Sequence, residues 1–525
     1  MKVLVADKLD RQGVEILMER GLEVEVKTDL SPKELEEKIK DYDALIVRSA
    51  TKVTEDIIKA ADRLKVIGRA GVGIDNVDVE AATKKGIVVM NSPTGNTISA
   101  AEHALAMLLS LSRNVPQAHS ALKEKRWEKK KFVGVEVYRK TLGVVGLGRV
   151  GTHLARIARG IGMEVIGHDP FITKEKAHGL GVELVEFEEL LKKADYISFH
   201  TPLTSETYHL IGREEMRVMK KNARIINCAR GGIIDEDALF EALQEGRIAG
   251  AALDVFEEEP PSNLPLLELE NVVVTPHLGA STHEAQFNVA VDIAESVASA
   301  LNRGIYKNAV NIPTIEANQW EEIKPYLLLG EKIGSFQGQL LEGNIDRIEI
   351  SYAGEVTSFN LSLITASLLK GLLHPVFSES INYVNAGVLA AGRGIKITEH
   401  KSQKAENFAS IVSLKITTDG NVCTIAGILF GEREPRIVQI DDYSVEVIPE
   451  GEILLCYNED KPGLIGKIGT ILGKSGINIG YMTYGKKTYG GEAITVLKLD
   501  TPLKKEIEEK IKNIEEVKKV KLLKL

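Results

Sequence analysis

Short apolar runs alternate with amphipathic segments through the first 300 or so residues, which is typical of buried parallel strands joined by helices. In the first series, the runs that predict strands are Val3–Ala6, Leu22–Val26, Ala44–Val47, Val66–Arg69 and Ile87–Met90. A helix predicted at Thr97–Arg113 leads into a second series. Its predicted strands are Thr141–Gly146, Glu164–Asp169, Tyr196–His200, Ala223–Ala229, Ala251–Val255 and Val272–Thr275. The amphipathic segment Glu284–Leu301 is expected to return the chain to the first unit.

The pattern changes beyond about Asn311, where the chain becomes richer in Gly, Ser, Thr and Asn as far as Gly451. We expect a separate domain there. The remaining segments read strand, helix, strand, strand, helix, strand: Glu452–Tyr457, Pro462–Lys474, Ile477–Tyr484, Glu492–Leu499, Leu503–Ile514 and Val517–Leu523. This βαββαβ order predicts a ferredoxin-like domain. A chain of 525 residues exceeds what one core supports, roughly 250 to 300 residues, so at least three domains are expected.

Charge and cysteine content exclude several classes of function. The net charge is −9 and no run of Lys and Arg stands apart, so we expect no nucleic-acid partner. The three cysteines Cys228, Cys423 and Cys456 lie far apart without a CxxC spacing. They predict neither a disulfide framework nor a metal site, and they favour a reducing compartment. No apolar run reaches roughly 18 residues and no signal sequence is visible, so a cytoplasmic protein without a membrane partner is expected.

A dinucleotide fingerprint follows the first strand of the second series. Gly146 allows the tight turn, Gly148 lets the backbone approach a pyrophosphate, and Gly151 lets helix and strand pack closely. Asp169 ends the next strand, where a carboxylate would bind the adenosine ribose and repel a 2′-phosphate. NAD is therefore expected as the cofactor. FAD is the main competitor, but its fingerprint usually lies near the chain's start, and here roughly 140 residues precede it.

Three polar residues follow later strands of the same series, where open α/β sheets bind ligands. They are Arg230, Glu259 and His277. Oxidising a 2-hydroxy acid needs a base for the hydroxyl proton and a cation for the carboxylate. His277 suits the first task with Glu259 orienting it, and Arg230 suits the second. Alternatively, His277 is a surface or core histidine and Arg230 with Glu259 a structural ion pair; His200 and His283 are expected to be structural.

These residues lie in the longer strings Asn227–Gly232, Leu253–Pro260 and Thr275–Ala280. With the fingerprint and Asp169 they closely resemble the D-isomer-specific 2-hydroxyacid dehydrogenases, over roughly Lys2–Pro313. The resemblance implies a discontinuous substrate domain, a central NAD domain and an Arg, Glu, His triad with the roles above. It also implies an NAD site lined by Val72, Gly146, Gly148, Arg149, Val150, Gly151, Asp169, Thr201, Cys228, Ala229, Arg230, Asp254, His277, Leu278, Gly279 and Ala280.

Within that family the chain is most similar to the long branch that acts on 3-phosphoglycerate. The strings Val47–Thr51 and Gly68–Asn76 match the branch's substrate region. Bidentate arginine contacts suit a phosphate, so Arg48 and Arg69 are expected to bind it, although either could be a surface arginine. The implied substrate-binding set is Arg48, Ser49, Arg69, Gly71 and Asn76. Trp127 and Lys131 could close the site from a neighbouring subunit.

The strings Tyr457–Gly466 and Gly476–Ile479 resemble the ACT signature, which clasps an amino acid between two subunits. The resemblance implies an allosteric L-serine site in which Asp460 pairs with the ammonium group and Asn478 holds the other end, in a homotetramer or homodimer. Asn458 departs from the side chains common at its position. In the preceding domain Arg436 is a retained basic position, whereas Ser444 and Ile448 replace basic residues of some relatives.

Together these resemblances imply an α/β chain of four parts. They are a flavodoxin-like substrate-binding domain at 1–96, completed by about 283–310, a Rossmann-type NAD domain at 97–282, an α+β intervening domain at 311–451 and a ferredoxin-like ACT domain at 452–525. The implied reaction is NAD-dependent oxidation of 3-phospho-D-glycerate at the head of serine synthesis. The alternatives are a glyoxylate or hydroxypyruvate type of 2-oxo acid reductase and a non-catalytic NAD-sensing binding protein.

Overall fold

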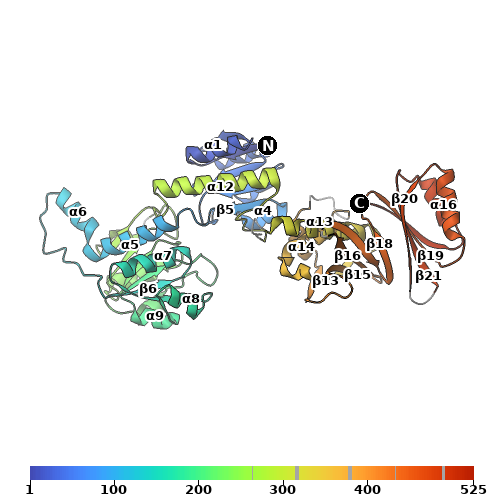
Figure 1. Cartoon of the computed structure of the whole chain (residues 1–525). Coiled ribbons are helices and arrows are strands. Elements are labelled where there is room, and N and C mark those ends of the chain that lie inside the picture. Colours follow the sequence, from blue (N-terminus) through green and yellow to red (C-terminus); the bar gives the residue numbers. More distant parts are fainter. Residues whose placement is uncertain (263, 314–318, 376–380, 432, 488–490) are drawn as a thin grey trace.

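Four β-sheets form the framework of the protein, as the computed structural model shows (Figure 1). The structure describes residues 1–262, 264–313, 319–375, 381–431, 433–487 and 491–525. The first sheet lies in the middle of an elongated molecule. The second lies on one side of it, and the third and fourth follow one another on the other side (Figure 1).

The first sheet is parallel and five-stranded, in the order β2-β1-β3-β4-β5. Its elements are β1 (Lys2–Val5), α1 (Arg11–Glu19), β2 (Glu23–Val26), α2 (Pro32–Lys38), β3 (Ala44–Val47), α3 (Glu55–Ala60), β4 (Val66–Arg69), α4 (Val79–Lys85) and β5 (Val88–Asn91). The much later helix α12 (His283–Arg303) packs against α1 and β4, with Ile293 and Val297 in the same core as Val5. The strand order is flavodoxin-like, and the return of α12 confirms the predicted discontinuous construction.

The second sheet is parallel and seven-stranded, in the order β12-β11-β10-β9-β6-β7-β8. Its strands are β6 (Thr141–Val145), β7 (Glu164–His168), β8 (Glu183–Leu184), β9 (Tyr196–Phe199), β10 (Arg224–Asn227), β11 (Gly250–Leu253) and β12 (Val272–Val274). Its helices are α5 (Thr97–Arg113), α6 (Val115–Lys123), α7 (Arg149–Gly160), α8 (Lys174–Gly179), α9 (Phe187–Lys193), α10 (Arg213–Val218) and α11 (Glu236–Gln244). The order reverses between β6 and β9, which confirms the Rossmann type and creates a ligand crevice at their carboxyl ends.

The third sheet is mixed and six-stranded, in the order β14-β13-β15-β16-β17-β18. Its strands are β13 (Ile345–Gly354), β14 (Lys396–Ser402), β15 (Ser410–Thr418), β16 (Val422–Phe430), β17 (Glu434–Ile440) and β18 (Tyr443–Val447), with helices α13 (Trp320–Leu340), α14 (Leu361–Leu373) and α15 (Ala386–Gly392). Helix α13 covers β16 and β17. Helices α13 and α14 meet backbone to backbone, because a Cβ at Gly334 would lie 2.1 Å from the carbonyl oxygen of Leu368.

The fourth sheet is antiparallel and four-stranded, in the order β20-β21-β19-β22. Its elements are β19 (Glu452–Glu459), α16 (Leu464–Lys474), β20 (Ile479–Lys486), β21 (Glu492–Leu499), α17 (Lys505–Lys512) and β22 (Val517–Lys524). Both helices pack their apolar faces onto one side of the sheet, around Leu454, Ile468 and Ile511. The βαββαβ order confirms the predicted ferredoxin-like domain.

Candidate active site

The carboxyl ends of strands from the first two sheets carry most of the predicted site residues. Arg48 follows β3 and Arg69 ends β4 in the first sheet. In the second sheet Arg230 follows β10, Glu259 follows β11 and His277 follows β12. Parallel sheets bind ligands at this edge, so the two domains present complementary walls of one site.

His277 and Glu259 form the pair that the sequence predicts. Nδ1 of His277 lies 2.8 Å from Oε2 of Glu259, while Oε1 of the same carboxylate accepts the Phe256 N–H at 3.2 Å. Burial alone would raise the pKa of Glu259, but the His277 bond and charge hold it below its usual range. The carboxylate is therefore charged at neutral pH and fixes the imidazole orientation. Within the described part of the chain nothing bonds Nε2 of His277, and the side chain is 43% exposed.

The turn that carries His277 is organised by Asp254, whose side chain is fully buried. Its carboxylate accepts hydrogen bonds from the Thr275 hydroxyl at 2.6 Å, the Leu278 N–H at 2.7 Å and the Gly279 N–H at 2.9 Å. The Asp254 carbonyl also accepts the His277 N–H at 2.9 Å. His277 has a φ of +54°, a region that non-glycine residues rarely adopt, so this network holds a strained backbone in place.

His103 on α5 completes this network, and sequence reasoning missed it because it lies within an ordinary helical pattern. Its Nε2 lies 3.1 Å from both the Asp254 carboxylate and the Thr275 hydroxyl. Although burial works in the other direction, His103 and Thr275 hold the pKa of Asp254 below its usual range. Cys228 lies beside the pair, with the three potential ligand atoms within 4.8 Å of one another. Burial raises the pKa of the Cys228 thiol, so it stays protonated and is a poor metal ligand.

Arg230 is bonded to a residue of the other domain. Its Nε donates to Oδ2 of Asp75 at 2.8 Å, although the two residues are 155 positions apart. Its own loop is shaped by the buried Asn227, whose amide donates to the Arg230 carbonyl at 2.8 Å. Sequence reasoning missed Asp75, because nothing in the local pattern separates it from a surface aspartate.

Arg69 lies near Arg230 and Arg48, and the positive charge of each acts on it. Burial and the neighbouring Arg230 charge together lower the pKa of Arg69 to about 10, and Asp75 offsets only part of this shift. The guanidinium is still charged at neutral pH. Its Nε is buried and has no hydrogen-bond partner among the residues that the structure describes. Two like charges and an unused donor are features of a site that awaits an anion.

The loop between β4 and α4 presses against both guanidiniums. A Cβ at Gly71 would lie 1.7 Å from Nη1 of Arg69, and one at Gly73 would lie 1.9 Å from Nη2 of Arg230. Asn76 shapes the wall, because its amide donates to the carbonyl oxygens of Arg48 and Thr51 at 2.7 and 2.6 Å. Ser49 is exposed, and Arg48 donates through Nη1 to the Lys8 carbonyl at 3.1 Å.

The three fingerprint glycines have the geometry that a dinucleotide requires. Gly146 has a φ of +91°, and a Cβ at Gly151 would lie 2.0 Å from the Gly146 carbonyl oxygen. A Cβ at Gly148, the residue before α7, would meet nothing within 4 Å, which leaves room for a pyrophosphate. Asp169 accepts the Leu147 N–H at 2.8 Å. Thr201 has a buried hydroxyl without a partner in the described ranges, which fits a residue that bonds a ligand.

The remaining residues of the predicted NAD set border the same crevice or the turns around it. Arg149 donates to the Pro93 carbonyl at 2.9 Å, which ties the fingerprint to the loop leaving the first sheet. The Val72 carbonyl accepts the Asn91 amide at 2.6 Å. Val150, Ala229 and Ala280 are half-buried, whereas Leu278 is 40% exposed.

Other predicted residues lie apart from this crevice. Trp127 is 80% exposed on the long segment after α6 that protrudes from the molecule, and Lys131 pairs with Glu270 at 2.6 Å (Figure 1). Asp460 and Asn478 lie in the fourth domain. The Asp460 carboxylate bonds Nζ of Lys486 at 2.7 Å and the Tyr484 hydroxyl at 2.9 Å, and Asn478 donates to Asp500 at 2.6 Å.

Arg436 and Asn458, two residues of the C-terminal half that the sequence singles out, both have partners inside the protein. Arg436 is mostly buried, pairs with Glu434 at 2.7 Å and lies over the Phe430 ring, so its charge is already engaged. Asn458 is buried and accepts the Thr495 hydroxyl at 2.9 Å inside the fourth sheet. Its unusual identity is therefore explained by internal hydrogen bonding.

Comparison with known proteins shows the family of the chain. Residues 105–279 match the family model of the D-isomer specific 2-hydroxyacid dehydrogenase NAD binding domain, 322–441 that of the D-3-phosphoglycerate dehydrogenase intervening domain, and 453–516 that of the ACT domain. D-3-phosphoglycerate dehydrogenase of Methanocaldococcus jannaschii is 48% identical over 526 residues, covering 100% of both chains. The chain belongs to the D-3-phosphoglycerate dehydrogenase family. The Bacillus subtilis enzyme of the family is 43% identical and covers 100% of this chain and 99% of its own.

Family membership makes the chain an NAD-dependent dehydrogenase. Solved structures of more distant relatives match part of it. A Thermus thermophilus protein aligns with 59% of this chain and 100% of its own, with a TM-score of 0.55 and 38% identity. D-lactate dehydrogenase from Aquifex aeolicus, complexed with NAD and lactic acid, covers 60% of this chain and 100% of its own at a TM-score of 0.53 and 29% identity. In the described ranges no helix is long and apolar enough to cross a bilayer.

The Asp75–Arg230 pair leads to a first prediction. Replacing Asp75 by Asn removes the carboxylate that occupies Arg230, so small carboxylate ligands should bind more tightly. Because Asp75 is 59% exposed, the gain is modest, about two- to fivefold in affinity. Calorimetric titration of oxalate into Asp75→Asn measures it, with the exposed Asp29→Asn as control. Weaker or unchanged oxalate binding in Asp75→Asn would show that the pair supports the ligand site rather than competes with it.

Proposed function

We propose that the chain oxidises 3-phospho-D-glycerate to 3-phosphohydroxypyruvate with NAD, the first step of L-serine biosynthesis. The observation that carries the proposal is the group of Arg48, Arg69 and Arg230, which lies at the carboxyl ends of the strands, as the His277–Glu259 pair does. The carboxylates of Asp75 and Asp7 lie near this group, and each raises the pKa of Arg69. A substrate with a carboxylate at one end and a phosphate at the other complements such a site.

The proton chemistry falls to His277 in this proposal. Nδ1 faces Glu259, so Nε2 is the atom that takes the proton from the C2 hydroxyl group. The charged Glu259 carboxylate stabilises the imidazolium that this transfer creates. Arg230 binds the substrate carboxylate and thereby orients C2. The substrate carboxylate replaces the Asp75 carboxylate on the guanidinium.

The phosphate is assigned to Arg69 and Arg48. Arg69 contributes the buried donor Nε that has no partner among the described residues, and the half-buried Arg48 contributes a second charge. Gly71 admits the Arg69 guanidinium, while Ser49 and Asn76 complete the wall. An unphosphorylated 2-oxo acid would leave this arginine pair unused, which is why the reductase alternative is less well supported.

NAD, when bound, accepts the hydride that leaves C2. We assign its pyrophosphate to the Gly146–Gly151 turn at the start of α7, and its adenosine ribose to Asp169. The carboxylate of Asp169 already accepts the N–H groups of Leu147 and Phe171, which holds it in place. The predicted set from Thr201 to Ala280 would line the nicotinamide half. The Asp254 network keeps that half in shape.

Domain roles and assembly extend the proposal. We assign residues 1–96 with about 283–310 to substrate binding, 97–282 to NAD, 311–451 to the intervening domain and 452–525 to regulation by serine across a subunit interface. A homotetramer or homodimer follows from that interface, and Trp127 on the protruding segment suits a contact with a second subunit. The thiols of Cys228, Cys423 and Cys456 are all free, which supports a reducing, cytoplasmic location.

The base assignment predicts separate effects for the two members of the pair. His277→Ala should lower kcat by about 10²-fold or more because the proton acceptor is lost, with NADH affinity little changed because the cofactor fingerprint is intact. Glu259→Gln keeps the shape but removes the charge, and should lower kcat by a smaller factor. Steady-state kinetics and NADH fluorescence titration measure both effects. Turnover within a few-fold of wild type in His277→Ala would exclude it as the base.

The phosphate assignment predicts a change in selectivity. Arg69→Ala should lower kcat/KM for 3-phosphoglycerate by about ten- to a hundredfold, because a charge-assisted contact of roughly 1.5 to 3 kcal/mol is lost. The loss for D-glycerate, which has no phosphate, should be much smaller. Arg247→Ala, which removes a surface arginine of the second domain, is the control. Equal losses on both substrates in Arg69→Ala would contradict a phosphate contact.

The serine site predicts a competition with Lys486. The serine ammonium group has to replace Nζ of Lys486 on the Asp460 carboxylate, so Asp460→Asn should abolish serine binding and Lys486→Gln should strengthen it severalfold. Calorimetric titration of serine into the full chain and both variants measures this. If wild type binds no serine at millimolar concentration and Lys486→Gln binds none either, the fourth domain senses another ligand or serves assembly alone.

A further inference from the structure

The turn that carries Glu259 lies at the surface, where packing does little to fix it. Phe256 is 6% exposed and is the last buried residue before the turn, whereas every residue from Glu257 to Pro260 is exposed. The Glu259 carboxylate nevertheless lies 2.8 Å from Nδ1 of His277. A catalytic pair on an exposed turn keeps such a distance only if other groups fix the backbone of the turn.

Glu236 and Glu257 fix this backbone through a reciprocal pair of hydrogen bonds. The Glu257 N–H donates to Oε1 of Glu236 at 2.8 Å, and the Glu236 N–H donates to Oε1 of Glu257 at 3.3 Å. Glu236 is the first residue of α11, where backbone N–H groups lack partners within the helix and favour a carboxylate. The pair therefore ties the turn to the start of a helix 21 positions earlier in the chain.

His209, in the loop between β9 and α10, joins the same pair. Its Nε2 lies 2.9 Å from Oε1 of Glu257, and its backbone N–H donates to the Gly232 carbonyl at 2.7 Å. The Tyr208 ring stacks on the imidazole, with 4.0 Å between the ring centroids. The Glu257 carboxylate is thus held by two separate segments of the NAD domain.

The loop that carries Arg230 contacts the turn directly. A Cβ at Gly231 would lie 1.8 Å from the Phe256 carbonyl oxygen, so the two backbones touch. The loop then continues to Asp235, the N-cap of α11. The start of α11 therefore positions Arg230 and Glu259 relative to one another.

The Glu236 carboxylate lies where its charge is disfavoured. Burial raises the pKa of Glu236, and the carboxylates of Glu257 and Asp237 raise it further, whereas the Glu257 N–H and His209 lower it. Carboxyl groups shifted by burial and by like charges are common where function requires a particular geometry.

We propose that Glu236 is a positioning residue for the reaction: by accepting the Glu257 N–H it fixes the turn that holds Glu259 against His277. The inference rests on the proposed function, in which His277 is the base. What Glu236 supplies is a hydrogen-bond acceptor and not its charge. An amide oxygen accepts the same bond, so glutamine should preserve this role and alanine should not.

Steady-state kinetics as a function of pH test the role in the full chain. Glu236→Ala should lower kcat with 3-phosphoglycerate by about tenfold, because a small displacement of a catalytic group is costly, and should leave KM for NAD within about twofold. The acid side of the kcat/KM profile should move to lower pH by about one unit, because the protonated imidazole loses part of its contact with a carboxylate. Glu236→Gln should keep kcat within about twofold of wild type, with the wild-type pH profile.

Two further variants separate positioning from a general effect on folding. Glu257→Ala removes the other half of the reciprocal pair and should reproduce the kinetic pattern of Glu236→Ala, and it decides the question if Glu236→Ala does not fold. Asp237→Ala removes an exposed carboxylate from the next residue of α11 and should leave kcat unchanged. Wild-type kcat in Glu236→Ala and Glu257→Ala overturns the proposal, and so does an equal loss in Glu236→Ala and Glu236→Gln.

Crystal structures of the Glu236 variants give a readout that does not depend on the reaction. The distance from Nδ1 of His277 to Oε2 of Glu259 is 2.8 Å in the wild-type chain. It should exceed about 3.5 Å in Glu236→Ala and return to the wild-type value in Glu236→Gln. An unchanged distance in Glu236→Ala contradicts positioning even if kcat falls. If the chain does not oxidise 3-phosphoglycerate at all, the proposed function fails, while these distances still decide whether Glu236 positions Glu259.

Discussion

The carboxylate of Asp254 is fully buried, and it accepts hydrogen bonds from the side chain of Thr275 and the backbone of Leu278 and Gly279. An unpaired charge at such a place would cost several kcal/mol, so the surrounding donors decide whether the turn can exist. With them in place, His277 is held at a positive φ with Nδ1 against Glu259. The geometry of the proposed base, the turn assigned to the NAD crevice and the anchoring of α5 through His103 all depend on this one carboxylate.

The other wall of the site comes from the first sheet domain, and charged side chains of the two domains interact there. Arg230 of the NAD domain and Arg69 of the substrate domain repel one another, and the Asp75 carboxylate offsets part of that repulsion. A substrate with two anionic ends relieves it more completely, since each end can meet its own arginine. Substrate binding and the approach of the two domains are therefore linked through the same charges.

Much of this architecture follows from the sequence. Strands such as Ala44–Val47 and Val66–Arg69 were predicted at their observed bounds because buried parallel strands are continuous apolar runs. The two-residue β8 carries too little pattern to be seen. The individual strands of the third sheet were not predicted either, since strands such as β15 are buried on alternate residues only and have no motif at their ends. The ordered motifs around Arg230, Glu259 and His277 identified the family.

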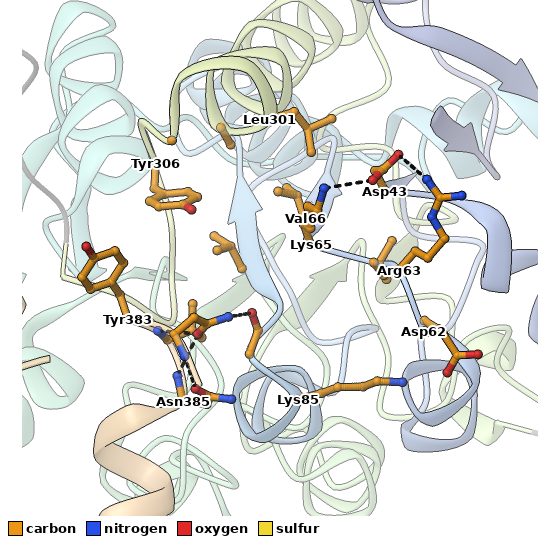
Figure 2. Close-up of a pocket in the computed structure, with 18 of the residues that line it drawn as sticks. Asp43, Asp62, Arg63, Lys65, Val66, Lys85, Leu301, Tyr306, Tyr383 and Asn385 are labelled. Atoms are coloured by element: carbon orange, nitrogen blue, oxygen red, sulfur yellow. Dashed lines mark hydrogen bonds and ion pairs between the residues drawn. The ribbon is translucent and has the colours of Figure 1, made fainter. Parts of the chain in front are cut away.

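Contacts between distant parts of the chain were beyond prediction. Asp75 meets Arg230 across 155 positions, and His103 reaches Asp254 from a helix whose pattern is fully explained by packing. A cavity between the first and third sheet domains is assembled from segments near residues 43, 85, 304 and 383, none of which carries a motif (Figure 2). Such sites depend on how the domains pack against one another, and the local hydrophobic pattern does not predict that packing.

The most direct test of the account is the rate of NADH formation by the wild-type chain with NAD and either 3-phosphoglycerate or D-glycerate. The two acids share the C2 hydroxyl and the carboxylate and differ in the phosphate. Because Arg48 and Arg69 are assigned to the phosphate, we expect kcat/KM to be at least tenfold higher for 3-phosphoglycerate than for D-glycerate. Equal rates with both acids, or NADH formation with neither, would contradict the assignment of the arginine group and of the reaction.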